Sequence, residues 1–405
     1  MNAIALVIDG WHAGYLGCYG NSWIDTPGVD ALAAEGHVFD QATIHSPRFE
    51  DIYRAYWQGG PDSLQLRLRL GGVATALVTD CPLVAGLPVA AEFDEVIRLD
   101  GVVRQSTAHD LAETGLASLL ATSAEWMETA RQPFLLWIHA RGLAAPWDAP
   151  LDFRARYADD DSVAPKTDAQ VPNLLLPSGF DPDALLPMRW AYAGQVAMFD
   201  ECLGGFVDIL RGSGLLDETL LAVVGARGFP LGEHRRVGLS DTVEAAIGPI
   251  ASPLLLYEEL IHVPWLLRLP HDTLAPARSQ ALVQPADLGA TLLDAFGCAA
   301  DKAAGHSLLV LARDEQDELR DRVACMGQGG ECSLRTRRWR LHWQEPVDGQ
   351  PATPPQLFVK PDDRWEVNDV ANRCPHVIDP LLQAFQDRNI ESPAPLLDIV
   401  TQPAE

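Results

Sequence analysis

Few residues of this chain combine a reactive side chain with a position suited to chemistry. Asp9 follows the apolar run from Ile4 to Ile8, at the end of an expected buried strand, where open α/β sheets place their ligands. Ser46 carries a hydroxyl, but a serine nucleophile needs a base or a metal ion beside it. Whether the chain has a catalytic site therefore depends on the residues around these two positions.

Apolar runs that alternate with helical patterns predict an α/β fold: a large, mostly parallel central sheet flanked by helices on both faces. A short helix should follow the first strand, with Thr26 as its N-cap and Gly36 at its end. The longest helical pattern runs from about Met188 to Leu210. The expected strands are Ile4 to Ile8, Ala74 to Val78, Phe134 to His139, Leu220 to Val224 and Val263 to Leu269.

Two parts are expected. Residues 1–304 should form the α/β domain, with a surface excursion at 152–187 and an irregular insertion at 238–253. Residues 305–405 should form a small C-terminal α+β subdomain with an antiparallel sheet, because short β-type runs and a final helix replace the earlier pattern. The β-type runs are 332–343 and 356–359, and the final helix is 376–387.

The charge of the chain limits its partners. The formal net charge is −26 over 405 residues, which argues against binding of nucleic acid, anionic membranes or sulfated polyanions by bulk electrostatics. A small local basic pocket remains compatible with this charge. A protein partner or a homo-oligomer has no residue-level signature here, and both stay open.

The cysteines and the first residues suggest a reducing compartment. Seven cysteines at irregular spacing do not form a disulfide framework or a zinc motif. The chain opens with MNAIALVIDG, without a cationic leader, and later apolar runs are too short to span a membrane. We therefore expect a cytoplasmic protein.

Several segments, in order along nearly the whole chain, resemble the sulfatase branch of the alkaline phosphatase superfamily. The opening IALVIDGWHAGYLGCYGN is similar to the family's Asp-Asp-x-Arg-x-x-Tyr-Leu-Gly-x-Tyr-Gly start, and SPRFEDIYRAYWQG is similar to its Ser-Pro-x-Cys-x-Pro-x-Arg signature. GARGFPLGEH resembles the Ser-Asp-His/Asn-Gly loop before Leu-Gly-Glu-His. Near the C-terminus, RTRRWRLHW and LFVKPDDRWEVNDVA resemble Arg-Thr-x-x-x-Lys-Leu and Leu-Tyr-Asp-Leu…Asp-Pro-x-Glu-x-x-Asn. The resemblance implies the sulfatase fold but not an activity.

The family chemistry implied by this resemblance needs a divalent cation, expected to be calcium, and a formylglycine made from the signature cysteine. Phe49 stands at the position of that cysteine, and a phenyl ring can neither attack an ester nor ligate a metal. Tyr53 stands at the position of the signature arginine. No catalytic residue is therefore assigned.

The resemblance also locates the metal ligands. Asp9 is the only one retained, because Gly10 stands at the second acid and Ala226 and Arg227 stand at the acid and its neighbour in the later loop. Calcium prefers about six to eight oxygen ligands, so we expect no cofactor.

The groups that would surround the substrate anion are replaced as well. Asp80 falls on the family's lysine, Pro82 on a histidine, and Ala144 on the histidine of Asp-Pro-His. An aspartate in place of a lysine would repel a sulfate.

Arg227 has two interpretations. Its guanidinium could pair with Asp9 and replace an exchangeable cation with a fixed one, or it could point to solvent from a loop. His234, in the retained Leu-Gly-Glu-His run, is more typical of a hydrogen-bonded structural histidine.

Three functions are compatible with these residues. The favoured one is a catalytically inactive sulfatase-like pseudoenzyme with a structural, regulatory or protein-binding role. The first alternative is a divergent sulfuric or phosphoric ester hydrolase with an atypical site, for which Ser46 is the candidate nucleophile. The second alternative is a module that binds a small ligand in the vestigial cleft.

Overall fold

The computed structural model describes residues 1–100, 104–158, 164–239, 255–272, 276–298, 305–346 and 353–386. Its main feature is an eight-stranded sheet with the order β10-β2-β9-β7-β1-β5-β3-β4. These strands are β1 (Asn2–Ile8), β2 (His37–Ala42), β3 (Ala74–Thr79), β4 (Glu95–Arg98), β5 (Phe134–Ala140), β7 (Thr219–Gly225), β9 (Trp265–Arg268) and β10 (Ala277–Val283).

The sheet is mostly parallel, as predicted. β1 pairs in parallel with β5 on one side and with β7 on the other. The exception is β9, which runs antiparallel to both β2 and β7. All seven residues of β1 are buried, which explains why the strand is a continuous apolar run rather than an alternating one.

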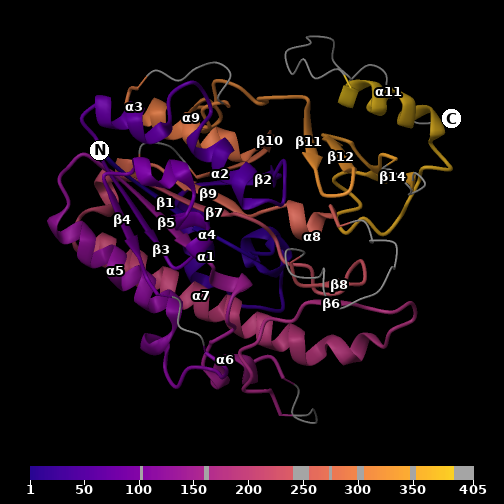
Figure 1. The fold of residues 1–405 in the computed structure, drawn as a ribbon, viewed down its shortest axis with the longest axis horizontal. Helices are drawn as coiled ribbons and strands as arrows, with labels where there is room; N and C mark the ends of the chain where they lie inside the picture. Colours follow the sequence, from indigo (N-terminus) through magenta and orange to yellow (C-terminus); the bar gives the residue numbers. More distant parts are fainter. Residues whose placement is uncertain are drawn as a thin grey trace.

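Helices cover both faces of this sheet (Figure 1). Alternate side chains of β1 point to opposite faces. Ile4, Leu6 and Ile8 pack in one apolar cluster with α1, α5 and α7, while Ala3, Ala5 and Val7 pack in a second cluster with α2, α3 and α9. The helices are α1 (Pro27–Glu35), α2 (Phe49–Trp57), α3 (Leu64–Leu70), α4 (Pro82–Ala85), α5 (Gly115–Thr129), α6 (Leu151–Ala155), α7 (Leu186–Gly212), α8 (Glu258–Ile261), α9 (Pro285–Ala295), α10 (Leu309–Ala312) and α11 (Pro375–Gln386).

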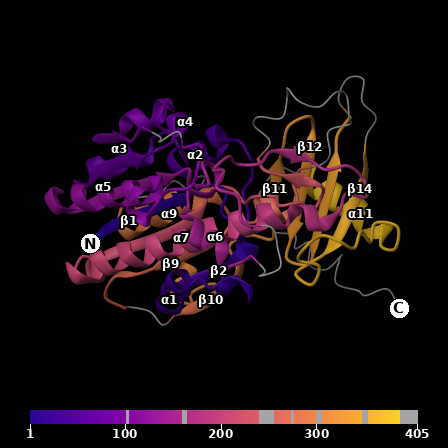
Figure 2. The same ribbon diagram turned by 90° about the horizontal axis from the view of Figure 1, so that it is seen from below.

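A separate four-stranded antiparallel sheet lies to one side of the central sheet (Figure 2). It consists of β11 (Arg322–Met326), β12 (Glu331–Thr336), β13 (Trp339–Gln344) and β14 (Thr353–Val359). Residues of this sheet and of α11 share a third apolar cluster. The predicted C-terminal antiparallel sheet is therefore confirmed, whereas the boundary between residues 304 and 305 stays a prediction.

The expected excursion and insertion have different outcomes. Within 152–187 the described residues include most of α6, the short strand β6 (Leu174–Leu175) and a 3-10 turn at Pro182–Leu185. β6 pairs with β8 (Arg236–Val237). Most of the predicted insertion at 238–253 lies outside the described residues. No described helix is long and apolar enough to cross a membrane.

The start of α1 differs from the prediction. Thr26 makes no capping bond, because its hydroxyl accepts instead from the Gly17 N–H at 2.9 Å. The carboxylate of Asp200, on α7, accepts from the N–H groups of Gly28 and Val29 at 2.9 and 2.7 Å. A side chain about 170 residues away along the chain thus accepts hydrogen bonds from the backbone N–H groups of the first turn. The local sequence around α1 cannot indicate such a partner.

Asp200→Ala should lower the free energy of unfolding by about 1–2 kcal/mol, because two N–H groups of α1 lose their acceptor. Asp208→Ala, an exposed change on the same helix, is the matched control and should have little effect. Urea unfolding of both variants measures the difference. Equal stabilities would show that Asp200 does not cap α1.

Asp200 should also make stability depend on pH. Burial raises the pKa of Asp200 from 3.8 to about 6, although the N–H groups of Val29 and Gly28 lower it. A carboxyl with a raised pKa binds its proton more tightly when folded, so its contribution is full below about pH 4 and is lost as the pH rises through about 6. The stability of the wild type relative to Asp200→Asn should therefore fall between these pH values. A pH-independent difference would contradict this assignment.

Candidate functional site

Three parallel strands bring the predicted site residues together. Ile8 is paired with Ala140 of β5 and with Gly225 of β7, so the residues that follow these strands meet at one edge of the sheet. The N–H of Asp9 donates to the Ala140 carbonyl at 2.9 Å, and that of Ala226 donates to the Ile8 carbonyl at 2.8 Å. Strand register therefore places Asp9 beside the turn that carries Arg227.

Arg227 pairs with Asp9, as one of the two predicted interpretations requires. Its Nε and Nη2 donate to Oδ1 and Oδ2 of Asp9, each at 2.9 Å. Their side chains are only 5% and 4% exposed. The two parallel bonds match the guanidinium fork to the carboxylate, the strongest geometry for this pair. Nη1 also donates to the Pro47 carbonyl at 3.2 Å, which ties the signature segment to the pair.

Phe49 covers the guanidinium. It is the first residue of α2, and the central carbon of the guanidinium lies 4.2 Å from its ring centroid. A cation over an aromatic face is favourable, more so where water is excluded. The Phe49 ring also lies edge to face with His139 at a centroid distance of 5.6 Å and is tilted against Tyr53 at 6.2 Å. Phe49, which the resemblance places at the signature cysteine, therefore packs against the Arg227 cation.

Tyr53 and His139 lie beneath Phe49. The hydroxyl of Tyr53 is hydrogen-bonded to Nδ1 of His139, and both side chains are fully buried. Burial lowers the pKa of His139 to about 3, and the charges of Arg227 and Arg141 act in the same direction. Burial also raises the pKa of Tyr53 well above its usual range. Both groups are thus neutral at neutral pH and form part of the core. His139 was predicted from the sequence only as the last residue of an expected strand, and that position at the end of an apolar run was the available signal.

Gly10 leaves no room for the second acid. Its φ is 73°, and a Cβ built there would lie 2.8 Å from the Ala144 nitrogen and 2.9 Å from the Leu143 carbonyl carbon. An aspartate at this position would require the 143–144 segment to move. Gly10 and Ala144, separated in sequence, are thus in direct contact at the site.

Asp80 is held by Arg141, which local sequence did not suggest. The Arg141 N–H donates to Oδ1 of Asp80 at 2.8 Å, and the side-chain Nε lies 3.8 Å from Oδ2. Burial raises the pKa of Asp80, while Arg141 opposes this shift. Pro82 begins α4, where a missing N–H is tolerated.

His234 is hydrogen-bonded away from the Asp9 pair. Its Nδ1 lies 2.8 Å from Glu259 and its Nε2 lies 3.2 Å from the Glu366 carbonyl, while its ring stacks on Tyr257 at 3.5 Å. Burial acts to lower its pKa, but the bond to Glu259 and the charge of that residue leave the pKa raised. These contacts are those of a hydrogen-bonded structural histidine.

Ser46 is buried and also committed to a partner. Its hydroxyl donates to Oδ2 of Asp51 at 2.8 Å and accepts from the Arg48 N–H at 3.2 Å. These bonds fix the turn before α2.

The side chains around Asp9, in this arrangement, do not form a suitable set of ligands for a divalent cation. Both oxygens of the carboxylate accept from Arg227, and a guanidinium would repel a second cation. Among the described residues, no group of three or more His, Cys, Asp or Glu side chains is placed to hold a metal ion. The chemistry available at this edge of the sheet is therefore that of a closed ion pair.

Arg227→Met should lower the free energy of unfolding by about 3–5 kcal/mol, because it leaves the Asp9 carboxylate buried without its partner. The double variant Asp9→Leu/Arg227→Met, which removes both charges, should recover much of this loss. Arg211→Met removes a half-exposed pair with Glu35 and is the control, with an expected effect of at most about 1 kcal/mol. Additive effects of the two site substitutions in denaturant unfolding would show that the pair does not stabilise the fold.

Solved structures confirm the fold class. The phosphonate monoester hydrolase of Agrobacterium radiobacter aligns with a TM-score of 0.73 and 17% identity over 95% of this chain and 94% of that chain. That of Silicibacter pomeroyi aligns with a TM-score of 0.68 and 16% identity over 95% and 94%. A protein solved with its substrate D-glucosamine-2-N,6-O-disulfate aligns with a TM-score of 0.70 and 16% identity over 95% and 96%. At these identities the similarity concerns the fold.

A family model described as Sulfatase matches residues 79–298, more than half of the chain. A search among curated proteins found no match. The family match corrects the expectation that no cofactor is involved: relatives in this family normally use a divalent metal and formylglycine, and nothing here shows a cofactor-free state. The misfit described above concerns only the Asp9 position. On the strength of this match and of the fold, the chain belongs to the sulfatase family.

Proposed function

We propose that this sulfatase-family protein does not hydrolyse sulfate or phosphate esters at the Asp9 position and that it has a structural, regulatory or protein-binding role instead. The observation that carries the proposal is the bidentate pair between Asp9 and Arg227. It places a fixed internal cation on the carboxylate that the family resemblance assigns to the metal.

The nucleophile position supports the same conclusion. Ester hydrolysis in this family requires an attacking group next to the bound anion, and Phe49 offers only a ring that packs against Arg227. An enzyme that loses a single catalytic group can keep a weak activity. Here the nucleophile, the metal ligands and the groups that would surround the anion differ together from the family pattern, and catalysis needs all of them at once.

Among the described residues beside the pair, His139, Tyr53 and Asp80 do not supply an alternative acid and base. A general base should have a pKa near the working pH, whereas burial lowers the pKa of His139 to about 3. Burial raises the pKa of its partner Tyr53 well above the usual range, so Tyr53 is also unsuited to this role. Asp80 is paired with Arg141 and carries a negative charge, so it cannot help to bind an anion.

The competing function is a divergent hydrolase. Two structural neighbours are phosphonate monoester hydrolases, which suggests phosphonate monoesters as one substrate class to test. Ser46 would be the attacking group, with Asp51 as its hydrogen-bond partner. A carboxylate bonded to a serine without an intervening histidine is a weak activating arrangement.

The purified protein should release no p-nitrophenol above background from an aryl sulfate, an aryl phosphate or an aryl phosphonate monoester. The reaction is monitored with and without added calcium, manganese or zinc, beside an active sulfatase as positive control. Asp9→Asn and Ser46→Ala variants are assayed in parallel. Saturable turnover by the wild type that either substitution abolishes would contradict the proposal, because it would require a working site at this edge of the sheet.

A further inference from the structure

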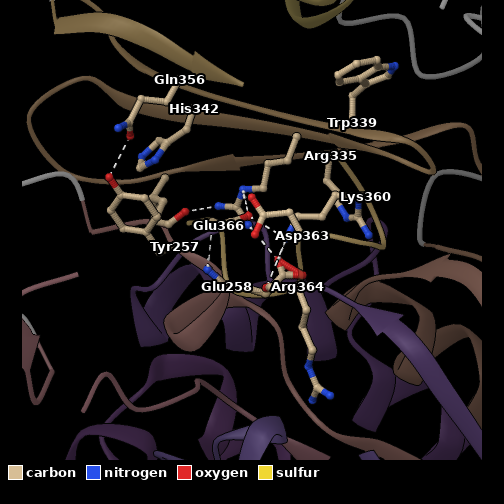
Figure 3. A network of polar contacts seen from close by, with 12 residues as sticks. Tyr257, Glu258, Arg335, Trp339, His342, Gln356, Lys360, Asp363, Arg364 and Glu366 are labelled. Carbon is tan, nitrogen blue, oxygen red and sulfur yellow. Dashed lines mark hydrogen bonds and ion pairs between the residues drawn. The ribbon is translucent and has the colours of Figure 1, made fainter. Parts of the chain in front are cut away.

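A buried ion network joins the C-terminal sheet to the α/β domain (Figure 3). Nζ of Lys360 lies 3.0 Å from Glu258 and 2.9 Å from Glu366. Arg340 lies 3.3 Å from Glu258 and 3.1 Å from Glu366. Two cations and two carboxylates therefore balance one another in the interior, where an unpaired charge would be costly.

Arg335, on β12, is an additional cation beside this balanced group. It is only 2% exposed, and its Nη2 donates to the Gln41 side chain. Its Nη1 is buried and has no hydrogen-bond partner among the described residues. Burial lowers the pKa of Arg335 to about 10, and the negative charge of Glu258 only partly offsets this.

Arg364 is a second such cation. Its side chain extends away from the carboxylates of the network (Figure 3), and its Nη1 donates to the Tyr19 carbonyl. Nη2 is buried without a hydrogen-bond partner in the described part of the chain. The guanidinium also lies 5.2 Å from the ring centroid of Trp365, a contact that does not neutralise its charge.

Both arginines line one cavity of about 560 Å³. Arg278 and Lys360 contribute two more cations to its wall, and Asp40 and Glu258 contribute two carboxylates. Arg278 is paired with Asp40 and Lys360 with Glu258. The positive charges of Arg335 and Arg364 thus remain in excess, on a chain whose net charge is −26.

We propose that this cavity binds the phosphate or sulfate group of a small molecule, held by the free guanidinium N–H groups of Arg335 and Arg364. Guanidinium groups donate in a planar fork that matches tetrahedral oxyanions, and an oxyanion bound beside either arginine would give its orphaned donor an acceptor. The volume leaves room for an attached group beside Tyr19 and Pro361. The site is separate from Asp9, so it goes beyond the proposed function and does not depend on it.

Titration calorimetry and thermal unfolding with inorganic phosphate and inorganic sulfate test this site, with sodium chloride at equal ionic strength as the reference. The wild type should show saturable binding and a higher Tm with at least one oxyanion. Arg335→Gln and Arg364→Gln should each weaken binding by roughly ten-fold or more, since each removes charge-assisted hydrogen bonds. Glucose 6-phosphate beside inorganic phosphate then separates a phosphorylated small molecule from the free ion.

Arg337→Gln is the matched control, because Arg337 lies in the same hairpin but is exposed and paired with Glu318. It should bind the oxyanion like the wild type, and so should Arg227→Met if that variant is folded. Should Arg335→Gln fail to fold, Arg364→Gln and Arg364→Lys carry the test. No saturable response beyond that of chloride, or equal binding by wild type and Arg364→Gln, would overturn the proposal.

Discussion

The pair between Asp9 and Arg227 is the constraint on which the interpretation of this fold depends. It lies where β1, β5 and β7 end together, and it connects three segments that are distant in sequence. The same guanidinium bonds to the carboxylate, to the Pro47 carbonyl and to the Phe49 ring. A change in any of these partners would leave a buried charge with fewer contacts, so the substitutions at this edge form a mutually dependent set.

The rest of the site is organised around that pair. The aromatic cluster beneath Phe49 contains Tyr53, Trp57 and Trp137, with Tyr53 and Trp57 only 4.5 Å apart. These rings fill space on the sheet face that carries α2. Gly10 and Ala144 complete the packing by allowing two loops to touch. In its described part, this edge of the sheet is thus filled by buried side chains.

Much of the fold could be predicted from the sequence because its signals are local. Apolar runs such as Ile4 to Ile8 indicated the strands, and the three- and four-residue spacing before Leu210 indicated α7. The reversed direction of β9 could not be predicted, since an apolar run has no direction. The sequence left two positions open for Arg227, paired with Asp9 or pointing to solvent. Pairing was a candidate because both residues follow expected strands of the same sheet. The bonds of Asp200 to α1 and of Arg141 to Asp80 join distant segments without a sequence signature.

The two unusual charge arrangements differ in kind. At Asp9 a cation and a carboxylate satisfy each other, whereas one N–H donor group each of Arg335 and Arg364 has no acceptor within the described part of the chain. The central claim concerns the first of these. A high-resolution crystal structure tests it most directly: the account predicts Nε and Nη2 of Arg227 within hydrogen-bonding distance of both Asp9 oxygens and the Phe49 ring over the guanidinium. An Arg227 side chain turned away from Asp9, with the carboxylate bound to another group, would contradict it.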